Sequence, residues 1–258
     1  MEKMEERVPE RASKKRKPDQ TNSDEESDGP MEADFLFNDP APEDYDGILA
    51  IIQGYLKKVP WELPKGSMDT TYGVLAQLIS EQPNLGTLVK TEDDEGEDAF
   101  VMAVLSVLNI KMYDQLSSLR DTIIALTKQH GSQQDLDAMT KLLTEERNQW
   151  SLDNADEEER QYYKLTHLVG ISRVFTDNAK HFNAKHMVYV KPEERFYCEE
   201  AIVKFMWSTG ESNKVDFYED GDESKPTKTR VVPEAMMLYC VPIGKYQSVV
   251  RKIVETFV

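Results

Sequence analysis

The sequence predicts a mixed α/β domain with about five or six strands, largely antiparallel, and helices packed on them. Two observations lead to this fold class. Apolar residues recur at helical spacing in several segments, and short runs rich in β-branched and aromatic residues lie between those segments. An acidic stretch separates two of the β-rich runs as a hairpin turn would, which favours antiparallel neighbours.

The domain is expected to span residues 31–258 and to follow a disordered arm, residues 1–30. The arm has almost no large apolar side chain, so it cannot bury enough surface to offset the entropy of ordering. Ordered structure is expected to begin with a short strand at Phe35 and Phe37, which precede the turn residues 38–40.

Two helices and a hairpin are predicted next. Apolar residues in the segment 48–59 have helical spacing, and a second helix ends before Pro83. Residues 86–90 have strand propensity, and the nearly continuous apolar run 100–110 is typical of a buried strand. These two strands are expected to pair as a hairpin with an acidic tip.

The C-terminal half continues the alternation of helices and strands. Further helices are predicted within residues 116–130 and 136–143, strands within 162–175, 201–207 and 236–241, and a long polar loop over 210–228. A last helix begins after Pro242, with a predicted buried stripe of Tyr246, Val249, Val250, Ile253, Val254 and Phe257.

The formal net charge of −17 restricts the partners of this chain. Repulsion from phosphates argues against direct nucleic-acid binding over the general surface. No apolar run approaches the roughly 20 residues of a membrane helix, so membrane insertion is not expected. The first thirty residues lack the apolar stretch of a secretory signal, which indicates an intracellular protein.

A compact basic cluster lies within the arm. It consists of Lys14, Lys15, Arg16 and Lys17. Because an importin groove binds an extended, accessible run of cations, we predict a nuclear localisation signal, with a chance basic patch as the alternative. Ser23 and Ser27 are followed by carboxylates, as acidophilic kinases require, and phosphate there would weaken the charge of the cluster.

The predicted hairpin tip is a second charged feature. Its six carboxylates are Glu92, Asp93, Asp94, Glu95, Glu97 and Asp98. Hard cations take several oxygen ligands, but this segment lacks the ligand spacing of a calcium loop. We therefore expect either a solvated loop or a contact for a basic partner, and we take these six residues as a candidate client-binding loop.

Motifs typical of catalysis do not occur in this sequence. No glycine-rich phosphate loop is present, and no Gln or Arg has the following glycine that begins the coenzyme A loop of acetyltransferases. The four histidines, at positions 130, 167, 181 and 186, form no helical metal pair and lie beside no nucleophile motif. Cys198 and Cys240 lack flanking cations, so buried, inert thiols are expected. We predict no catalytic residue, no metal site and no cofactor.

Four segments carry a family resemblance. They are residues 41–48 (APEDYDGI), residues 85–90 (LGTLVK) with the acidic stretch and the strand after it, residues 194–205 (ERFYCEEAIVKF), and the C-terminal strand and helix. They occur in order along most of residues 31–258. In these segments the sequence resembles the BCCIP family, whose fungal members are the Bcp protein-transport proteins.

The resemblance implies a fold and a set of partners. The fold would be akin to the GNAT acetyltransferase superfamily, without the acetyl-coenzyme A loop. Fungal members are linked to nuclear export of a phosphatidylinositol-4-phosphate 5-kinase and to chaperoning a basic large-subunit ribosomal protein. Animal members interact with a cell-cycle kinase inhibitor and a recombination mediator. The resemblance therefore implies a nuclear binding protein that shuttles to the cytoplasm. Importin is a further expected partner because of the basic cluster at residues 14–17.

One segment departs from the family pattern. After Arg147 the family has a proline-containing apolar stretch, a strand and a helix, whereas this chain continues directly with Asn148. Loss of a central strand would expose the ladder groups of its neighbours and leave a gap in the core. The departure has the character of a splice variant or of a gap in the gene model.

Three functions follow in order of support. The first is a non-enzymatic nuclear chaperone and export factor whose acidic loop holds a basic client and thereby assists ribosome biogenesis. The second is an adaptor of cell-cycle and DNA-repair proteins that uses an apolar groove instead of charge. The third is a degenerate acyltransferase.

Overall fold

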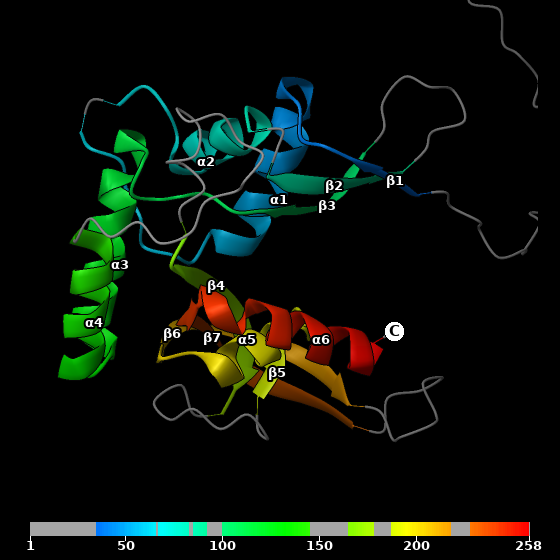
Figure 1. Cartoon of the computed structure of the whole chain (residues 1–258). Coiled ribbons are helices and arrows are strands. Elements are labelled where there is room, and N and C mark those ends of the chain that lie inside the picture. Colours follow the sequence, from blue (N-terminus) through cyan, green and yellow to red (C-terminus); the bar gives the residue numbers. More distant parts are fainter. Residues whose placement is uncertain are drawn as a thin grey trace, which may run out of the picture. The chain divides into compact units, whose positions relative to one another are not determined.

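The computed structural model describes residues 35–65, 67–82, 85–91, 100–144, 165–177, 187–217 and 228–257 (Figure 1). The chain divides into two units, Met1–Ala33 and Asp34–Val258, and every described residue belongs to the second. The predicted arm lies outside the described residues, so its boundary stays a prediction. Among the described residues, no helix combines the length and apolar character that crossing a membrane requires.

The first sheet has the strand order β1-β2-β3, and both of its strand pairs are antiparallel. Its strands are β1 (Phe35–Asn38), β2 (Gly86–Thr91) and β3 (Val101–Ser106). The predicted first strand and the predicted pairing of the hairpin strands are thus confirmed. Helix α1 (Tyr45–Leu56) packs on β3. This close approach requires Gly47, because a Cβ there would lie 2.6 Å from Cγ2 of Val101.

Four helices confirm the predicted helical segments of the N-terminal half. Besides α1 these are α2 (Thr71–Ser80), α3 (Ser117–His130) and α4 (Gln133–Thr144), with short 3-10 turns at Pro42–Asp44 and Asp114–Leu116. The hydroxyl of Thr70 caps α2 by accepting from the Gly73 N–H at 3.1 Å. Before α4, the Asp135 carboxylate accepts from the Ser132 N–H at 2.8 Å, while the Ser132 hydroxyl accepts from the Asp135 N–H at 3.1 Å.

The second sheet has the strand order β5-β4-β7-β6, again with antiparallel pairs. Its strands are β4 (His167–Thr176), β5 (Met187–Tyr189), β6 (Val203–Phe217) and β7 (Lys228–Pro242). Helix α5 (Glu194–Glu200) packs on β7, and α6 (Tyr246–Phe257), which follows a 3-10 turn at Ile243–Lys245, packs against α5 (Figure 1). Strand β7 is central and is buried over residues 234–241.

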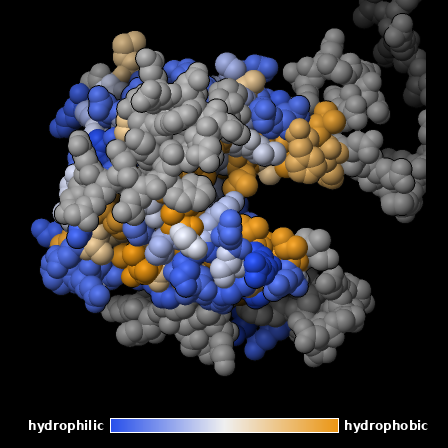
Figure 2. Space-filling view, viewed as in Figure 1, coloured by the Kyte–Doolittle hydropathy of each residue, from blue (hydrophilic) through white to orange (hydrophobic). Residues whose placement is uncertain are grey.

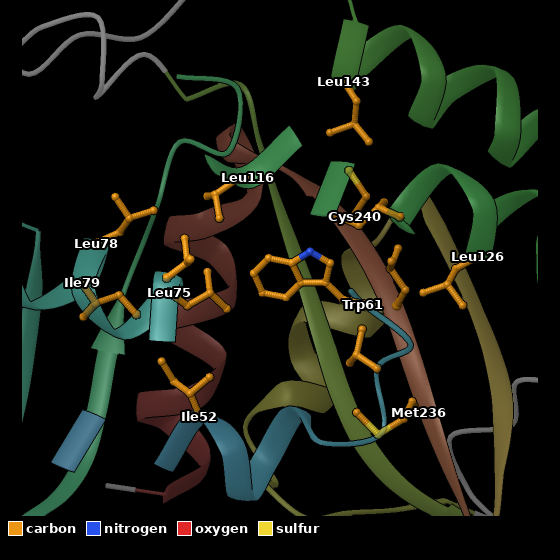
Figure 3. Close-up of a cluster of buried hydrophobic side chains, with 14 of the residues drawn as sticks. Ile52, Trp61, Leu75, Leu78, Ile79, Leu116, Leu126, Leu143, Met236 and Cys240 are labelled. Carbon is orange, nitrogen blue, oxygen red and sulfur yellow. The ribbon is translucent and has the colours of Figure 1, made fainter. Parts of the chain in front are cut away.

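Alternate residues of β7 enter two different cores. Met236, Leu238 and Cys240 belong to a large core with α1, α2, α3 and α4, whereas Met237 and Tyr239 belong to a smaller core that includes Cys198 of α5. In the large core, Trp61 lies amid the cluster with its ring between side chains of α2 and β7 (Figure 3). Its indole N–H donates to the Ser118 hydroxyl at 2.9 Å, which satisfies its one polar group.

The fold class is confirmed, since the described residues form a mixed α/β structure with antiparallel strands. The strands are, however, divided between two sheets instead of forming one. Both sheets contribute to the large core through Leu88 and Leu238. The GNAT-like arrangement stays a prediction, and residues 145–164, which include the departure after Arg147, lie outside the described residues.

Strand β3 is exposed on one face, so the prediction of a buried strand in residues 100–110 is wrong. Met102 and Leu105 are 58% and 69% exposed, whereas Val101 and Val104 pack against the large core. The strand lies at the edge of its sheet, and α1 packs on its inner face. A continuous apolar run in the sequence does not show whether one face of the strand or both faces are buried.

The predicted loop over residues 210–228 is also wrong at both ends. Strand β6 continues to Phe217 and β7 begins at Lys228, so the two strands extend past a register shift between Ser208 and Ser212 as a two-stranded ribbon. Gly210 has a φ of +78° at this shift, a conformation that glycine adopts readily. The polar residues led to the prediction of a loop. A two-stranded ribbon exposed to solvent needs no apolar face, so polar residues suit it equally well.

The predicted buried stripe of the last helix is only partly buried. Val249 is fully buried, but Tyr246, Val254 and Phe257 are exposed. Phe257 still contacts Phe196 of α5 edge to face, with 6.1 Å between the ring centroids. The buried stripe of α6 is therefore narrower than its sequence pattern predicts.

Candidate binding surface

All predicted site residues lie outside the described part of the chain. These are Lys14, Lys15, Arg16 and Lys17 of the basic cluster, Ser23 and Ser27, and the acidic residues Glu92, Asp93, Asp94, Glu95, Glu97 and Asp98. The structure does describe the strands on either side of the acidic segment. The Thr91 N–H donates to the Phe100 carbonyl at 3.1 Å, so the two ends of residues 92–99 are held together by a paired stem.

The base of this stem is fixed by a partly buried ion pair. Lys90 Nζ lies 2.5 Å from Oδ1 of Asp44, which is buried at the start of α1. The other carboxylate oxygen of Asp44 accepts from the Ala41 N–H at 3.1 Å. Because Asp44 already neutralises Lys90, the nearest basic residue on the N-terminal side does not offset the charge of residues 92–98.

The strand registers divide the first sheet into two chemically different faces. Phe35 pairs with Thr91, Phe37 with Val89, Val89 with Ala103, and Leu105 with Thr87, so these side chains share one face. The opposite face carries Leu88 and Val104, which pack toward the core.

We name the first of these the apolar face. Its large side chains are exposed: Phe35 by 53%, Phe37 by 74% and Phe100 by 71%, in addition to Leu105. It comprises Phe35, Phe37, Val89, Phe100, Ala103 and Leu105. Figure 2 shows hydrophobic residues gathered over the end of the molecule where β1 lies.

The two thiols are buried as predicted. Cys198 and Cys240 are fully buried and form no disulfide. Burial raises the pKa of each thiol to about 12. A thiol with such a pKa is not ionised at neutral pH and is a poor nucleophile.

Two of the histidines lie within the described residues. His130 stacks on Trp207 with 6.1 Å between ring centroids, and His167 begins β4. Burial lowers the pKa of both rings, so each is predominantly neutral at pH 7. The described residues contain no group of three or more metal-ligating side chains.

A buried carboxylate on β7 is a feature that we did not predict. Glu234 Oε2 accepts from Arg173 Nη2 at 2.6 Å and from Asn213 Nδ2 at 2.8 Å. Its other oxygen is buried without a hydrogen-bond partner among the described residues. Because Glu234 is fully buried, this ion pair fixes β4, β6 and β7 together and is closed to a substrate. The sequence contains one sign of this buried carboxylate, because Glu234 is the single acid within the otherwise apolar residues 231–241.

A second polar link joins α1 to α5. The hydroxyl of Tyr55 donates to Glu194 and accepts from the Arg173 main-chain N–H at 3.2 Å. Lys191 Nζ lies 4.5 Å from the centre of the Tyr55 ring. Burial raises the pKa of Glu194, and the hydrogen bond from Tyr55 partly opposes that rise. No sequence motif indicates this contact, because its partners are far apart in the chain.

A groove lies between α3 and α4 on the described surface. Exposed and half-buried residues line it, including Lys128, Lys141 and Asp137. It lacks the buried, convergent polar groups that orient a small ligand. The surface with the clearest chemical character is therefore the apolar face beside the acidic segment.

The geometry defines a mixed α/β domain with an exposed apolar sheet surface, and part of the chain is similar to known proteins. Residues 30–152 match the BCCIP family model. The Protein BCCIP homolog of Arabidopsis thaliana is 33% identical over 100 residues. That match covers 39% of this chain and 27% of the plant protein's length. The crystal structure of BCP1 from Saccharomyces cerevisiae aligns with a TM-score of 0.48 and 16% identity, over 90% of this chain and 93% of that one.

Residues 30–152, just under half of the chain, therefore carry the similarity to the BCCIP family, and the chain spans about a quarter of the length of the plant relative.

Proposed function

We propose that this chain is a non-enzymatic nuclear chaperone and export factor that holds a basic protein client at residues 92–98. One observation carries the proposal: a paired stem, β2 and β3, presents six carboxylates in one connecting segment, while Lys90 is already neutralised by Asp44. The similarity of residues 30–152 to the BCCIP family supports a general role in nuclear protein transport.

The physical task of such a segment is to mask cations. A basic protein that binds RNA attracts other polyanions before assembly, and a cluster of carboxylates competes for its Lys and Arg side chains. Because six charges lie close together in sequence, their attraction is long-ranged at low salt and is screened at physiological ionic strength. Binding should therefore be fast and salt-sensitive.

The finer partners belong to the same proposal. The client is a basic large-subunit ribosomal protein, and a phosphatidylinositol-4-phosphate 5-kinase is an export cargo. Importin binds Lys14, Lys15, Arg16 and Lys17, which gives the chain a nuclear location from which it shuttles to the cytoplasm.

Two variants of equal net charge test the role of the acidic segment. In the first, its six carboxylates become Asn or Gln. In the matched control, six exposed carboxylates elsewhere are changed in the same way: Asp46, Glu62, Asp69, Asp121, Asp137 and Glu255. Recovery of basic ribosomal proteins from a nuclear extract should fall for the first variant alone. Equal recovery with both variants would remove the role given to residues 92–98.

An adaptor of cell-cycle and DNA-repair proteins is the second candidate, and the apolar face favours it. A contact made through apolar side chains changes little with salt, whereas a charge-led contact weakens steeply. Measuring partner affinity at low and physiological ionic strength separates the two functions. The third candidate, a degenerate acyltransferase, would be revived if acetyl-coenzyme A raised the melting temperature.

The nuclear address is tested separately. Replacing Lys14, Lys15, Arg16 and Lys17 by Ala should abolish importin binding and leave a fluorescent fusion in the cytoplasm. Ser23→Asp with Ser27→Asp should weaken importin binding through the added negative charge. Unchanged nuclear accumulation of the alanine variant would show that the cluster is not the address.

A further inference from the structure

The apolar face presents a large uncharged surface to solvent. Phe35, Phe37 and Phe100 are each more than half exposed, and Leu105 is 69% exposed. Since a phenylalanine side chain has an area of roughly 150–250 Å², these four side chains leave roughly 500 Å² of apolar surface in water. This area is near the upper end for a patch on a monomeric soluble protein, and patches of this size mark interaction sites.

The shape of the apolar face suits a second copy of itself. One cross-strand row runs from Phe37 on β1 through Val89 on β2 to Ala103 on β3. The two ends of this row differ in size, because the exposed ring of Phe37 stands at one end and the single methyl group of Ala103 at the other. When two such sheets are stacked, a two-fold axis parallel to the strands and above Val89 places Phe37 of each copy over Ala103 of the other.

Charge also favours an uncharged occupant. None of the six residues of the apolar face carries a charge, and Lys90, the one basic residue of β2, has its side chain bound to Asp44. A charged segment would lose its hydration on this surface without gaining a partner, whereas an identical apolar face loses nothing. Each copy carries a net charge of −17, but repulsion between exposed charges more than about 8 Å apart is largely screened at physiological ionic strength.

We propose that a second copy of this chain covers the apolar face, so that two molecules pack sheet against sheet about this two-fold axis. Phe37 of each molecule enters the space above Ala103 of the other, and Val89 meets its own counterpart. The two faces together bury roughly 1,000 Å², which is near the lower limit for a specific interface, so the dimer exchanges with monomer at micromolar concentrations. This dimer is independent of the proposed function, which assigns the client to other residues.

Sedimentation equilibrium of the full chain tests the dimer directly. As the concentration rises from about 1 to 200 µM, the mean mass should increase from that of one chain toward that of two. Because the two negatively charged copies repel each other, the association constant should increase as salt is raised from about 0.05 to 0.5 M. A charge-led client complex has the opposite salt dependence. A chain that stays monomeric over this whole range would overturn the inference.

Substitutions on the two outer strands show which surface mediates the dimer. Phe37→Ser on β1 and Leu105→Ser on β3 should each weaken the dimer by at least about tenfold, because each removes exposed apolar area from the buried surface. An interface through one edge of the sheet would respond to only one of these changes, and that result would overturn the inference. Val231→Ser and Val254→Ser, which remove exposed valines elsewhere, should leave the dimer unchanged.

An exchange of sizes within the row gives the sharpest test. Ala103→Phe alone places a ring opposite Phe37 of the other copy and should abolish the dimer, whereas Phe37→Ala alone leaves a gap and should weaken it. The two changes combined restore one large and one small side chain at opposite ends of the row, so the dimer should return. Both positions are exposed, and circular dichroism checks that each variant is folded. A combined variant that associates no better than Ala103→Phe would overturn the sheet-on-sheet arrangement.

Discussion

The Tyr55 hydroxyl donates a hydrogen bond of 2.5 Å to the Glu194 carboxylate, across 139 positions of sequence. Tyr55 projects from α1, which packs on the first sheet, and Glu194 begins α5, which packs on the second. The same hydroxyl accepts from the main-chain N–H of Arg173 on β4. One side chain therefore satisfies polar groups of two other elements, and its loss affects both.

Tyr55→Phe tests the strength of this link. The change leaves the ring in place but removes a donor to a buried carboxylate and an acceptor for a strand N–H, so the free energy of unfolding should fall by about 1–3 kcal/mol. Urea unfolding measures it. Tyr246→Phe is the matched control, since Tyr246 is exposed, and it should change stability by less than about 0.5 kcal/mol. Equal effects of the two changes would mean that the link does not stabilise the fold.

Glu194 should make stability depend on pH. Its folded pKa is raised by burial, whereas an unfolded Glu titrates near about pH 4.3. Between these two pKa values the folded chain binds more protons than the unfolded chain, so the contribution of Glu194 to stability is lost as pH rises. Relative to the wild type, Glu194→Gln should therefore become more stable as pH rises from about 4 toward neutrality.

Glu200→Gln provides a control of opposite sign. Hydrogen bonds from Lys252 and Lys245 lower the folded pKa of Glu200, so its contribution is present above the unfolded pKa and lost on acidification. Relative to the wild type, this variant should become less stable as pH rises. Denaturant unfolding of both variants over this pH range measures the two trends, and parallel trends would contradict the assignment.

Arg173→Met should be strongly destabilising, because it leaves the buried Glu234 without its charged partner. Breaking a buried pair on one side costs about 3–5 kcal/mol. Replacing both partners, Arg173→Met with Glu234→Met, removes the buried charge and should recover most of that loss. Guanidinium unfolding measures all three forms. A double variant no more stable than the single one would show that the pair contributes through packing instead of charge.

Gly170→Ala should be destabilising for a steric reason. A Cβ at Gly170 would lie 2.2 Å from Cζ of Tyr239, its cross-strand partner on β7, and overpacking of this kind costs about 1–3 kcal/mol. Gly54→Ala in α1 meets no atom within 4 Å and should be stabilising, by up to about 1 kcal/mol. Melting temperatures distinguish the two. The loss at Gly170 should shrink in a Tyr239→Leu background, and an unchanged loss would exclude the ring as its cause.

Helices α1, α2, α3, α4 and α6 were predictable, because the apolar residues of each recur at helical spacing. Ile48 and Ile52 were placed on the buried side of α1 by spacing alone, and both are buried. Strand β5 has only three residues and α5 only seven, which is too short for a period to appear. The ribbon beyond Ser212 could not be predicted from composition, because its polar residues suit either a loop or a solvated strand pair.

The charged segments could also be identified in the sequence, but the apolar face could not. Phe37 has the apolar character of a core residue, and only the structure places it on the uncovered side of its sheet. Burial of that side depends on which element packs there, a tertiary property that alternation does not encode. The Tyr55–Glu194 contact likewise depends on how α1 and α5 approach each other.

Strand β7 pairs with β6 and with β4, and the segments that connect it to these two strands differ greatly in length. Only residues 218–227 separate it from β6, whereas residues 177–227 separate it from β4. Since the entropy of closing a loop rises with its length, the β6–β7 hairpin should form first, and pulse-labelled hydrogen exchange would find Leu238 protected before Val174. Phe205 and Leu238 of this hairpin also complete the core beneath α1 and α2. During synthesis, the N-terminal sheet therefore leaves the ribosome before the residues that finish its core, and it must wait for the last third of the chain.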